Sequence, residues 1–182
     1  MSPILGIYAS QVSGKLWPAS SYESIATVTV GAGGASSSSF TSIPSTYKHL
    51  QIRWISRSSG GAYNPTIQFN SDTGSNYAWH YIDGNGSSAS SGNTANTNNI
   101  LLPAISNNAN IFATGIIDIL DYSNTNKFKT TRTFQGVDYN GSGAIDLFSG
   151  LWRSTSAISS ILLNFSSAQY SQFALYGIKD VA

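Results

Sequence analysis

The residues that could carry out acid–base chemistry are few and far apart in this sequence of 182 residues. It holds one glutamate, Glu23, and the aspartates Asp118 and Asp146 each stand near the end of a predicted strand or beside a turn. A glycosidase needs two carboxyl groups held about 5–10 Å apart, and these two aspartates are the pair that could supply them. Aspartate at turns and strand ends more commonly accepts hydrogen bonds from nearby backbone N–H groups. We therefore expect structural carboxylates and no enzyme.

Nucleophilic and metal chemistry also lack the side chains they need. The chain has no cysteine, which suits folding in a reducing cytosol. Its two histidines, His49 and His80, could act as bases, but the sequence contains no Gly-x-Ser-x-Gly motif to supply a nucleophilic serine. A zinc site would need carboxylates at matched positions. The segment that starts at Asp138 resembles a calcium loop, but Ser149 stands where that loop requires a glutamate. We expect a hairpin turn there, two structural histidines, and no metal or other cofactor.

The charge content narrows the class of partner. Charged residues make up 9% of the chain, against about 25% in an ordinary soluble domain, and the formal net charge is +1 with the basic residues scattered. Nucleic-acid binding would need a denser basic stripe. No stretch approaches the roughly 20 apolar residues of a membrane span, and the opening residues lack the basic start and apolar length of a secretory signal. We expect neither nucleic acid nor membrane as a partner.

Apolar and polar residues alternate with a period of two in segment after segment. The alternation is clearest in residues 49–57, where Leu50, Ile52 and Trp54 share one face, and such a pattern indicates a half-buried strand. Turn-forming residues recur at the spacing found in sandwiches and barrels. We expect about ten strands in an all-β, antiparallel β-sandwich over residues 21–182, with the jelly roll as its form.

Four segments carry more particular expectations. Residues 83–99 are rich in Gly, Ser and Asn and predict a long loop. Residues 111–122 are apolar on both faces, which predicts a central strand that is covered on each side or that forms a subunit contact. Residues 127–139 alternate as well. One face carries Phe128, Thr130, Arg132 and Phe134, and the other carries Lys127, Lys129, Thr131 and Thr133. Pro103 predicts an edge position for the short strand around it.

A row of aromatic residues in the predicted strand at 77–82 has two interpretations. Tyr77, Trp79 and Tyr81 share one face of that strand, and aromatic rings beside polar loop residues could bind a glycan. Aromatic residues at strand spacing are more often core residues, because their burial stabilises a sheet. Both interpretations stay open at this stage.

Residues 1–20 differ from the body that follows. Their apolar residues do not keep a period of two, and Pro3 and Gly6 interrupt them. Such a cluster needs a surface to bury against, either the core of its own subunit or a neighbouring subunit or lattice. We expect an extended N-terminal arm that binds a partner through its apolar residues, which are Ile4, Leu5, Ile7, Tyr8, Leu16 and Trp17.

Several phrases resemble those of small virion structural proteins of tailed bacteriophages. They are SPILGIYASQ, YESIATVTVGAGGASS, FTSIPSTYKHLQIRW, DTGSNYAWHYIDGNGSSASS, GIIDILDYSNTNKFKT, LFSGLWRSTSAISSI and FALYGIKD, and together they extend from Ser2 to Asp180. Proteins of this family are described as virion structural, minor tail or head-decoration (cement) proteins, the last often β-sandwiches that form trimers. The resemblance transfers no catalytic residue.

The resemblance implies a capsid decoration protein. Such a protein would assemble in the host bacterial cytoplasm, form a homotrimer, and bind the major capsid protein (or a tail protein) on the outside of the virion, where binding stabilises the lattice. The alternative that the resemblance leaves open is a tail-fibre or minor tail module that binds glycans on the host surface.

Overall fold

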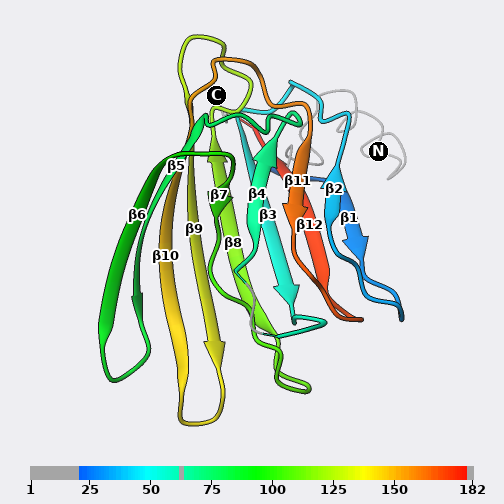
Figure 1. The fold of residues 1–182 in the computed structure, drawn as a ribbon. Coiled ribbons are helices and arrows are strands. Elements are labelled where there is room, and N and C mark those ends of the chain that lie inside the picture. The colour runs from blue at the N-terminus through cyan, green and yellow to red at the C-terminus, as the bar shows by residue number, and fades with distance from the viewer. Residues whose placement is uncertain (1–20, 62–63, 180–182) are drawn as a thin grey trace, which may run out of the picture.

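The chain folds into two antiparallel β-sheets packed face to face (Figure 1). The computed structural model describes residues 21–61 and 64–179, and these residues contain strands and no helix. In spatial order the large sheet consists of β1 (Tyr22–Thr29), β12 (Gln172–Ile178), β3 (His49–Ser56), β8 (Ala113–Leu120), β9 (Lys129–Asp138), β10 (Gly143–Trp152), β5 (Tyr77–Gly84) and β6 (Ala89–Thr97). The small sheet consists of β2 (Ser38–Phe40), β11 (Ile161–Asn164), β4 (Thr66–Phe69) and β7 (Ile100–Leu101).

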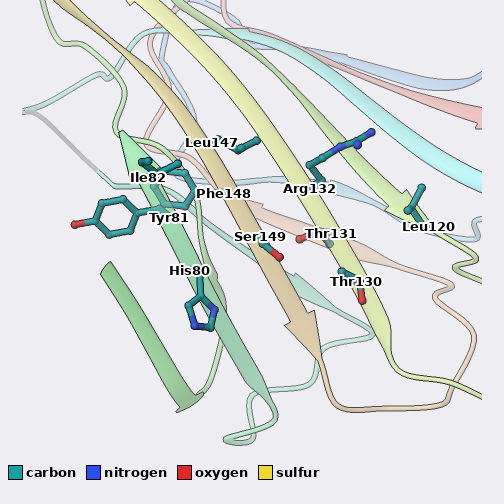
Figure 2. Close-up of a pocket in the computed structure, with 10 residues that line it drawn as sticks. All are labelled: His80, Tyr81, Ile82, Leu120, Thr130, Thr131, Arg132, Leu147, Phe148 and Ser149. Carbon is teal, nitrogen blue, oxygen red and sulfur yellow. The ribbon is translucent and has the colours of Figure 1, made fainter. Parts of the chain in front are cut away.

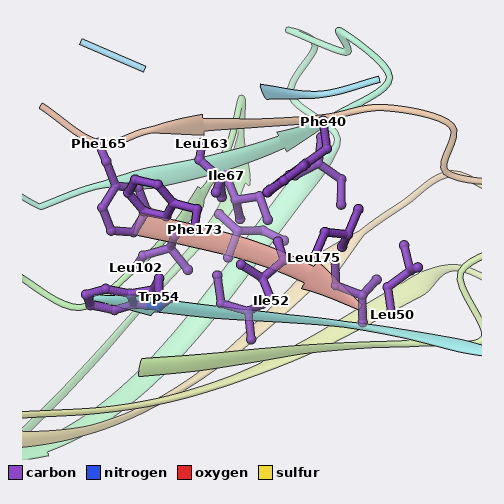
Figure 3. Close-up of a cluster of buried hydrophobic side chains, with 14 of the residues drawn as sticks. Phe40, Leu50, Ile52, Trp54, Ile67, Leu102, Leu163, Phe165, Phe173 and Leu175 are labelled. Atoms are coloured by element: carbon purple, nitrogen blue, oxygen red, sulfur yellow. The ribbon is translucent and has the colours of Figure 1, made fainter. Parts of the chain in front are cut away.

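The core lies between the inner faces of the two sheets (Figure 3). The alternation in residues 49–57 buries Leu50, Ile52 and Trp54 from β3, as the sequence predicts. The small sheet contributes Ile67 and Phe69, which are fully buried. Burying a side chain of this size contributes about 1.5–3 kcal/mol each, so this half of the large sheet is held by a well-filled apolar interior.

Two large aromatic rings on the inner face of the large sheet lie over glycines of the neighbouring strand, Trp54 in the core and the half-buried Tyr81 outside it. Trp54 of β3 pairs with Gly115 of β8, and a Cβ at Gly115 would lie 2.6 Å from the indole ring. Tyr81 of β5 pairs in the same way with Gly92 of β6, again with 2.6 Å between the ring and a Cβ. Covering a strand glycine with an aromatic ring fixes the pairing register, and these two pairs anchor β8 and β6 in the sheet.

The expected all-β, antiparallel sandwich is confirmed. The jelly roll is not established, because that form has eight strands in two Greek keys and the strands here divide into eight and four. The edge position expected around Pro103 is confirmed, since β7 ends the small sheet. The hairpin turn expected after Asp138 is confirmed as well: it joins β9 to β10, and Tyr139 donates its backbone N–H to the Ser142 carbonyl oxygen at 2.7 Å.

The long loop expected over residues 83–99 is wrong. β5 continues to Gly84, a turn follows, and β6 runs from Ala89 to Thr97 as the edge strand. The Asn85 side chain accepts hydrogen bonds from the backbone N–H groups of Ser87 and Ser88, which closes the turn. Local propensity is poor for a strand here, but pairing with β5 outweighs it, because strand preference depends mainly on the neighbours in the sheet.

Candidate functional site

The outer face of the large sheet, which the small sheet does not cover, carries an uninterrupted row of apolar side chains. Ile116, Phe134, Leu147 and Ile82 are direct cross-strand neighbours on β8, β9, β10 and β5. All four are exposed, Phe134 by 55% of its side chain's reference area. We call these four residues the outer apolar row. Ile145, exposed by 63%, lies two residues along β10 from Leu147 on the same face.

Strand β9 explains how this face arises. The alternation expected over 127–139 is present, but the threonine side is the buried one: Thr131, Thr133 and Gln135 point inward and Phe134 points outward. The strand expected over 111–122 is β8, and it is buried on one face only, since Ile116 and Leu120 are exposed on the other. Its outer face is therefore not covered by any of the residues that the structure describes. Exposed apolar patches of this kind commonly mark interaction sites.

A groove of about 510 Å³ lies along this face (Figure 2). Leu147 and Ile82 line it together with Leu120, and Arg132 and His80 add polar groups. Figure 2 shows these side chains arising from neighbouring strands of the one sheet. Its lining combines one imidazole and one guanidinium with apolar and hydroxyl side chains.

A chain of polar contacts runs beside the outer apolar row. Arg132 forms an ion pair with Asp118 at 2.8 Å, and Gln51 donates to the other oxygen of Asp118 at 2.8 Å. Arg53 in turn donates to Gln51 at 2.9 Å. The polar groups on this part of the face are thus paired with one another, which leaves the apolar row as the feature that needs a partner.

The two aspartates considered as an acid–base pair lie on opposite faces of the sheet. Asp118 is on the outer face, in the ion pair with Arg132, whereas Asp146 points inward and is 7% exposed. Two carboxyl groups separated by the thickness of a sheet cannot flank one glycosidic bond. Asp138 accepts a hydrogen bond from the Asn140 backbone N–H, as expected for a turn aspartate.

The histidines and the other aspartates have structural contacts. His49 accepts the backbone N–H of Asp121 through Nδ1 at 2.9 Å, and His80 is exposed on the outer face. An ion pair with Lys127, together with one to Lys48, lowers the pKa of Asp121. Within residues 21–61 and 64–179, no three of His, Asp and Glu gather closely enough to hold a metal ion. The described chain also forms no helix of the length and apolar character needed to cross a membrane.

The three aromatic residues considered for glycan contact have different environments. Tyr77 is fully buried, and its hydroxyl lies within hydrogen-bond distance of the Phe69 N–H and the Asp72 carbonyl oxygen. Burial raises the pKa of Tyr77 to about 12. Tyr77 is therefore a core residue with no ring face for a ligand. Trp79 and Tyr81 are half-buried and stack on one another.

The aromatic stack continues onto β10 and meets a second, smaller pocket on the inner face. Tyr81 stacks on Phe148 with 5.0 Å between ring centroids, and both residues line a pocket of about 250 Å³ that also contains Asp83 and Asp146. The sequence alone did not identify Phe148, Asp83 or Asp146 as residues of a pocket. The only available signal was the alternation that places Tyr81 and Asp83 on one face of β5.

The apolar residues predicted to form the N-terminal arm lie in residues 1–20, outside the described residues. This part of the prediction covers Ile4, Leu5, Ile7, Tyr8, Leu16 and Trp17. The first described strand, β1, begins at Tyr22 on the edge of the large sheet.

No family model, curated protein or solved structure matches this chain. Its function must therefore be inferred from the sequence, the fold and the surfaces described above.

Proposed function

We propose that this protein is a non-enzymatic structural protein of a tailed-bacteriophage virion, a capsid decoration protein that attaches to the outside of the head lattice. The observation that carries the proposal is the outer apolar row, which crosses four strands and whose members are left exposed by the described part of the chain. An apolar sheet face of this extent is stabilised when it packs against a partner surface. The resemblance of the sequence phrases to virion structural proteins indicates which partner, the major capsid protein.

Multiple copies on a symmetric lattice fit the rest of the molecule. Among the described strands, β1 and β6 are the two edges of the large sheet, and exposed strand edges are a hazard that closed assemblies remove. A homotrimer that covers these edges would bridge neighbouring capsid subunits, and each copy bound would stabilise the lattice by mass action. The low charge content of the chain suits a protein whose surface is largely in contact with other subunits.

The experiment uses virions or capsids of the encoding phage from which this protein has been removed. Purified wild-type protein should co-sediment with the capsids and raise the temperature at which they release DNA. The double substitution Phe134→Ser and Leu147→Ser should abolish both effects while the protein stays folded, because both side chains are exposed. Tyr170→Ser removes a still more exposed ring from a different part of the surface and serves as the control. The proposal would be wrong if the capsids did not bind the wild-type protein and were equally stable to heat with and without it.

A second candidate is a tail-fibre or minor tail module that binds host-surface glycans. The half-buried stack of Trp79, Tyr81 and Phe148 favours it, because an aromatic surface next to polar groups is a usual feature of such sites. Immunogold labelling of the virion separates the two candidates. Label on the head supports decoration, and label on the tail supports the second candidate.

A further inference from the structure

On the large sheet, the small pocket has an aromatic wall and an acidic wall. It lies where the small sheet ends at β7, so Leu101, Leu102 and Ala104 form one side and the inner face of β5 and β10 forms the other. This position borders the core at Leu102 and lies on the opposite face of the sheet from the outer apolar row. What the pocket binds is therefore a question separate from attachment to the particle.

The aromatic wall is preformed. The rings of Tyr81 and Phe148 are 17° from parallel, and the Trp79 ring lies 6.1 Å from that of Tyr81. Gly92 lets the Tyr81 ring lie across β6, because any Cβ there would collide with it. The Tyr81 hydroxyl has no hydrogen-bond partner in the described structure. The wall thus presents an apolar surface with a free polar group at its end.

The acidic wall consists of two carboxyl groups that are direct cross-strand neighbours, Asp83 and Asp146. Asp146 is more than nine-tenths buried; one of its oxygens accepts a hydrogen bond from Gln135 at 2.9 Å, and the other accepts none from the described residues. Ser90 donates to one oxygen of Asp83. Neither carboxyl group has a lysine or arginine partner in the described part of the chain.

This arrangement costs stability in the empty protein. Like charges opposite each other on neighbouring strands are unfavourable, and burial, together with the charge of Asp83, raises the pKa of Asp146. The pocket therefore holds hydrogen-bond acceptors that lack donors, next to an apolar surface. A ligand that brings hydroxyl or ammonium donors on one side and an apolar C–H face on the other satisfies both walls, whereas an anionic ligand is repelled.

We propose that this pocket binds a sugar ring that carries no negative charge, a neutral hexose or a hexosamine. The sugar packs its C–H face on Tyr81 and Phe148 and donates hydroxyl hydrogens to Asp83 and Asp146. Sugars with a carboxylate, such as uronic and sialic acids, are excluded. The inference does not depend on whether the protein decorates the head or belongs to the tail.

The test is saturation-transfer NMR on the full-length protein with three probes of matched size: N-acetylglucosamine, glucosamine and glucuronic acid. Transfer to the ring protons is expected for the first two and not for glucuronic acid. Tyr81→Ala should weaken binding about tenfold, since it removes a stacking surface worth up to about 1.5 kcal/mol. His80→Ala, on the outer face of the same strand, is the matched control and should leave binding unchanged.

A second variant tests the charge argument without removing the ring. Asp83→Asn with Asp146→Asn keeps the size of both side chains and should allow glucuronic acid to bind. No transfer to either uncharged or amino sugar would overturn the inference, as would unchanged binding in a folded Tyr81→Ala protein. Amide shifts at the pocket on adding Ca²⁺ alone, with no response to any sugar, would also overturn it and identify the two carboxyl groups as a cation site. None of these results affects capsid co-sedimentation, so the two proposals fail separately.

Discussion

The two halves of the large sheet use their faces in opposite ways. In the half formed by β12 and β3, large apolar side chains such as Ile52 and Phe173 point inward. The outer face there carries Arg53, which lies over the Tyr176 ring at 5.5 Å, and the exposed Ile55. In the half formed by β9 and β10, Thr133 and Gln135 point inward and Phe134 points outward. Among the described residues, the first half buries most of its large apolar side chains between the sheets, whereas the second leaves a row of them exposed on its outer face.

The alternation of apolar and polar residues therefore identifies a strand without identifying which of its faces is buried. In β9 the inner face needs polar groups, because Gln135 donates to the Ala104 carbonyl oxygen at 2.8 Å and to Asp146. A buried polar side chain is tolerated when it is hydrogen-bonded in this way. The more apolar face of an isolated strand can therefore be its outer one, and in a subunit of an assembly that inversion marks the contact surface.

The largest expected effect contrasts one phenylalanine from each half. Phe173→Ala removes a fully buried ring and should lower the free energy of unfolding by about 3–5 kcal/mol. Phe134→Ala removes an exposed ring and should change it by no more than about 0.5 kcal/mol, while weakening capsid attachment. Urea titration followed by tryptophan fluorescence measures both. Equal losses of stability would show that Phe134 is a core residue and would contradict the contrast between the two halves of the large sheet.

The next effect concerns a lysine buried at the start of β9. Lys129 is fully buried, and its ammonium group donates to the carbonyl oxygens of Asn124, Lys127 and Thr155. Burial lowers its pKa. Lys129→Ala leaves these carbonyls without their donor and should cost about 3 kcal/mol, measured by the same titration. The exposed Lys127 is the control: Lys127→Ala should cost less than about 1 kcal/mol, and a comparable cost for the two would contradict the role of Lys129.

A smaller effect, of opposite sign, is expected for the inward-facing carboxyl group. The folded-state pKa of Asp146 is raised above its unfolded value, so this group favours the folded state most below about pH 4 and loses that contribution as pH rises through the folded pKa. Asp146→Asn should therefore raise the free energy of unfolding by about 1 kcal/mol at pH 7. The gain should shrink as the pH is lowered toward 4. Asp118→Asn breaks a surface ion pair and should show no such gain; a gain in that variant alone would reverse the assignment of the two faces.

The smallest effect on stability is expected from deletion of residues 2–17. If these residues form an arm that binds a partner, the body should unfold at the same urea concentration as the full chain while no longer attaching to capsids. If the deletion unfolds the domain, these residues are part of its core. Circular dichroism and co-sedimentation distinguish the two outcomes.

The sequence predicts the strands of the core better than it predicts the surfaces. The inward row of β3 and the hairpin after Asp138 follow from local pattern, because apolar alternation and turn residues act locally. The edge strand β6 does not, because its Ser- and Asn-rich sequence is held by pairing with β5 rather than by propensity. The separation of Asp118 from Asp146, the burial of Tyr77 and the pairing of Asp83 with Asp146 all depend on which face of each strand turns inward, and that is decided by packing between the sheets.

Lys129 also gives the molecule an internal reporter of its own opening. An amine-reactive reagent can reach the exposed Lys48, Lys127 and Lys179 in the native state, but it can reach Lys129 only when the start of β9 separates from its neighbours. The rate at which Lys129 acquires label therefore measures how often this half of the sheet opens. Followed by mass spectrometry with and without capsids, that rate would show whether attachment holds the inverted half of the sheet closed.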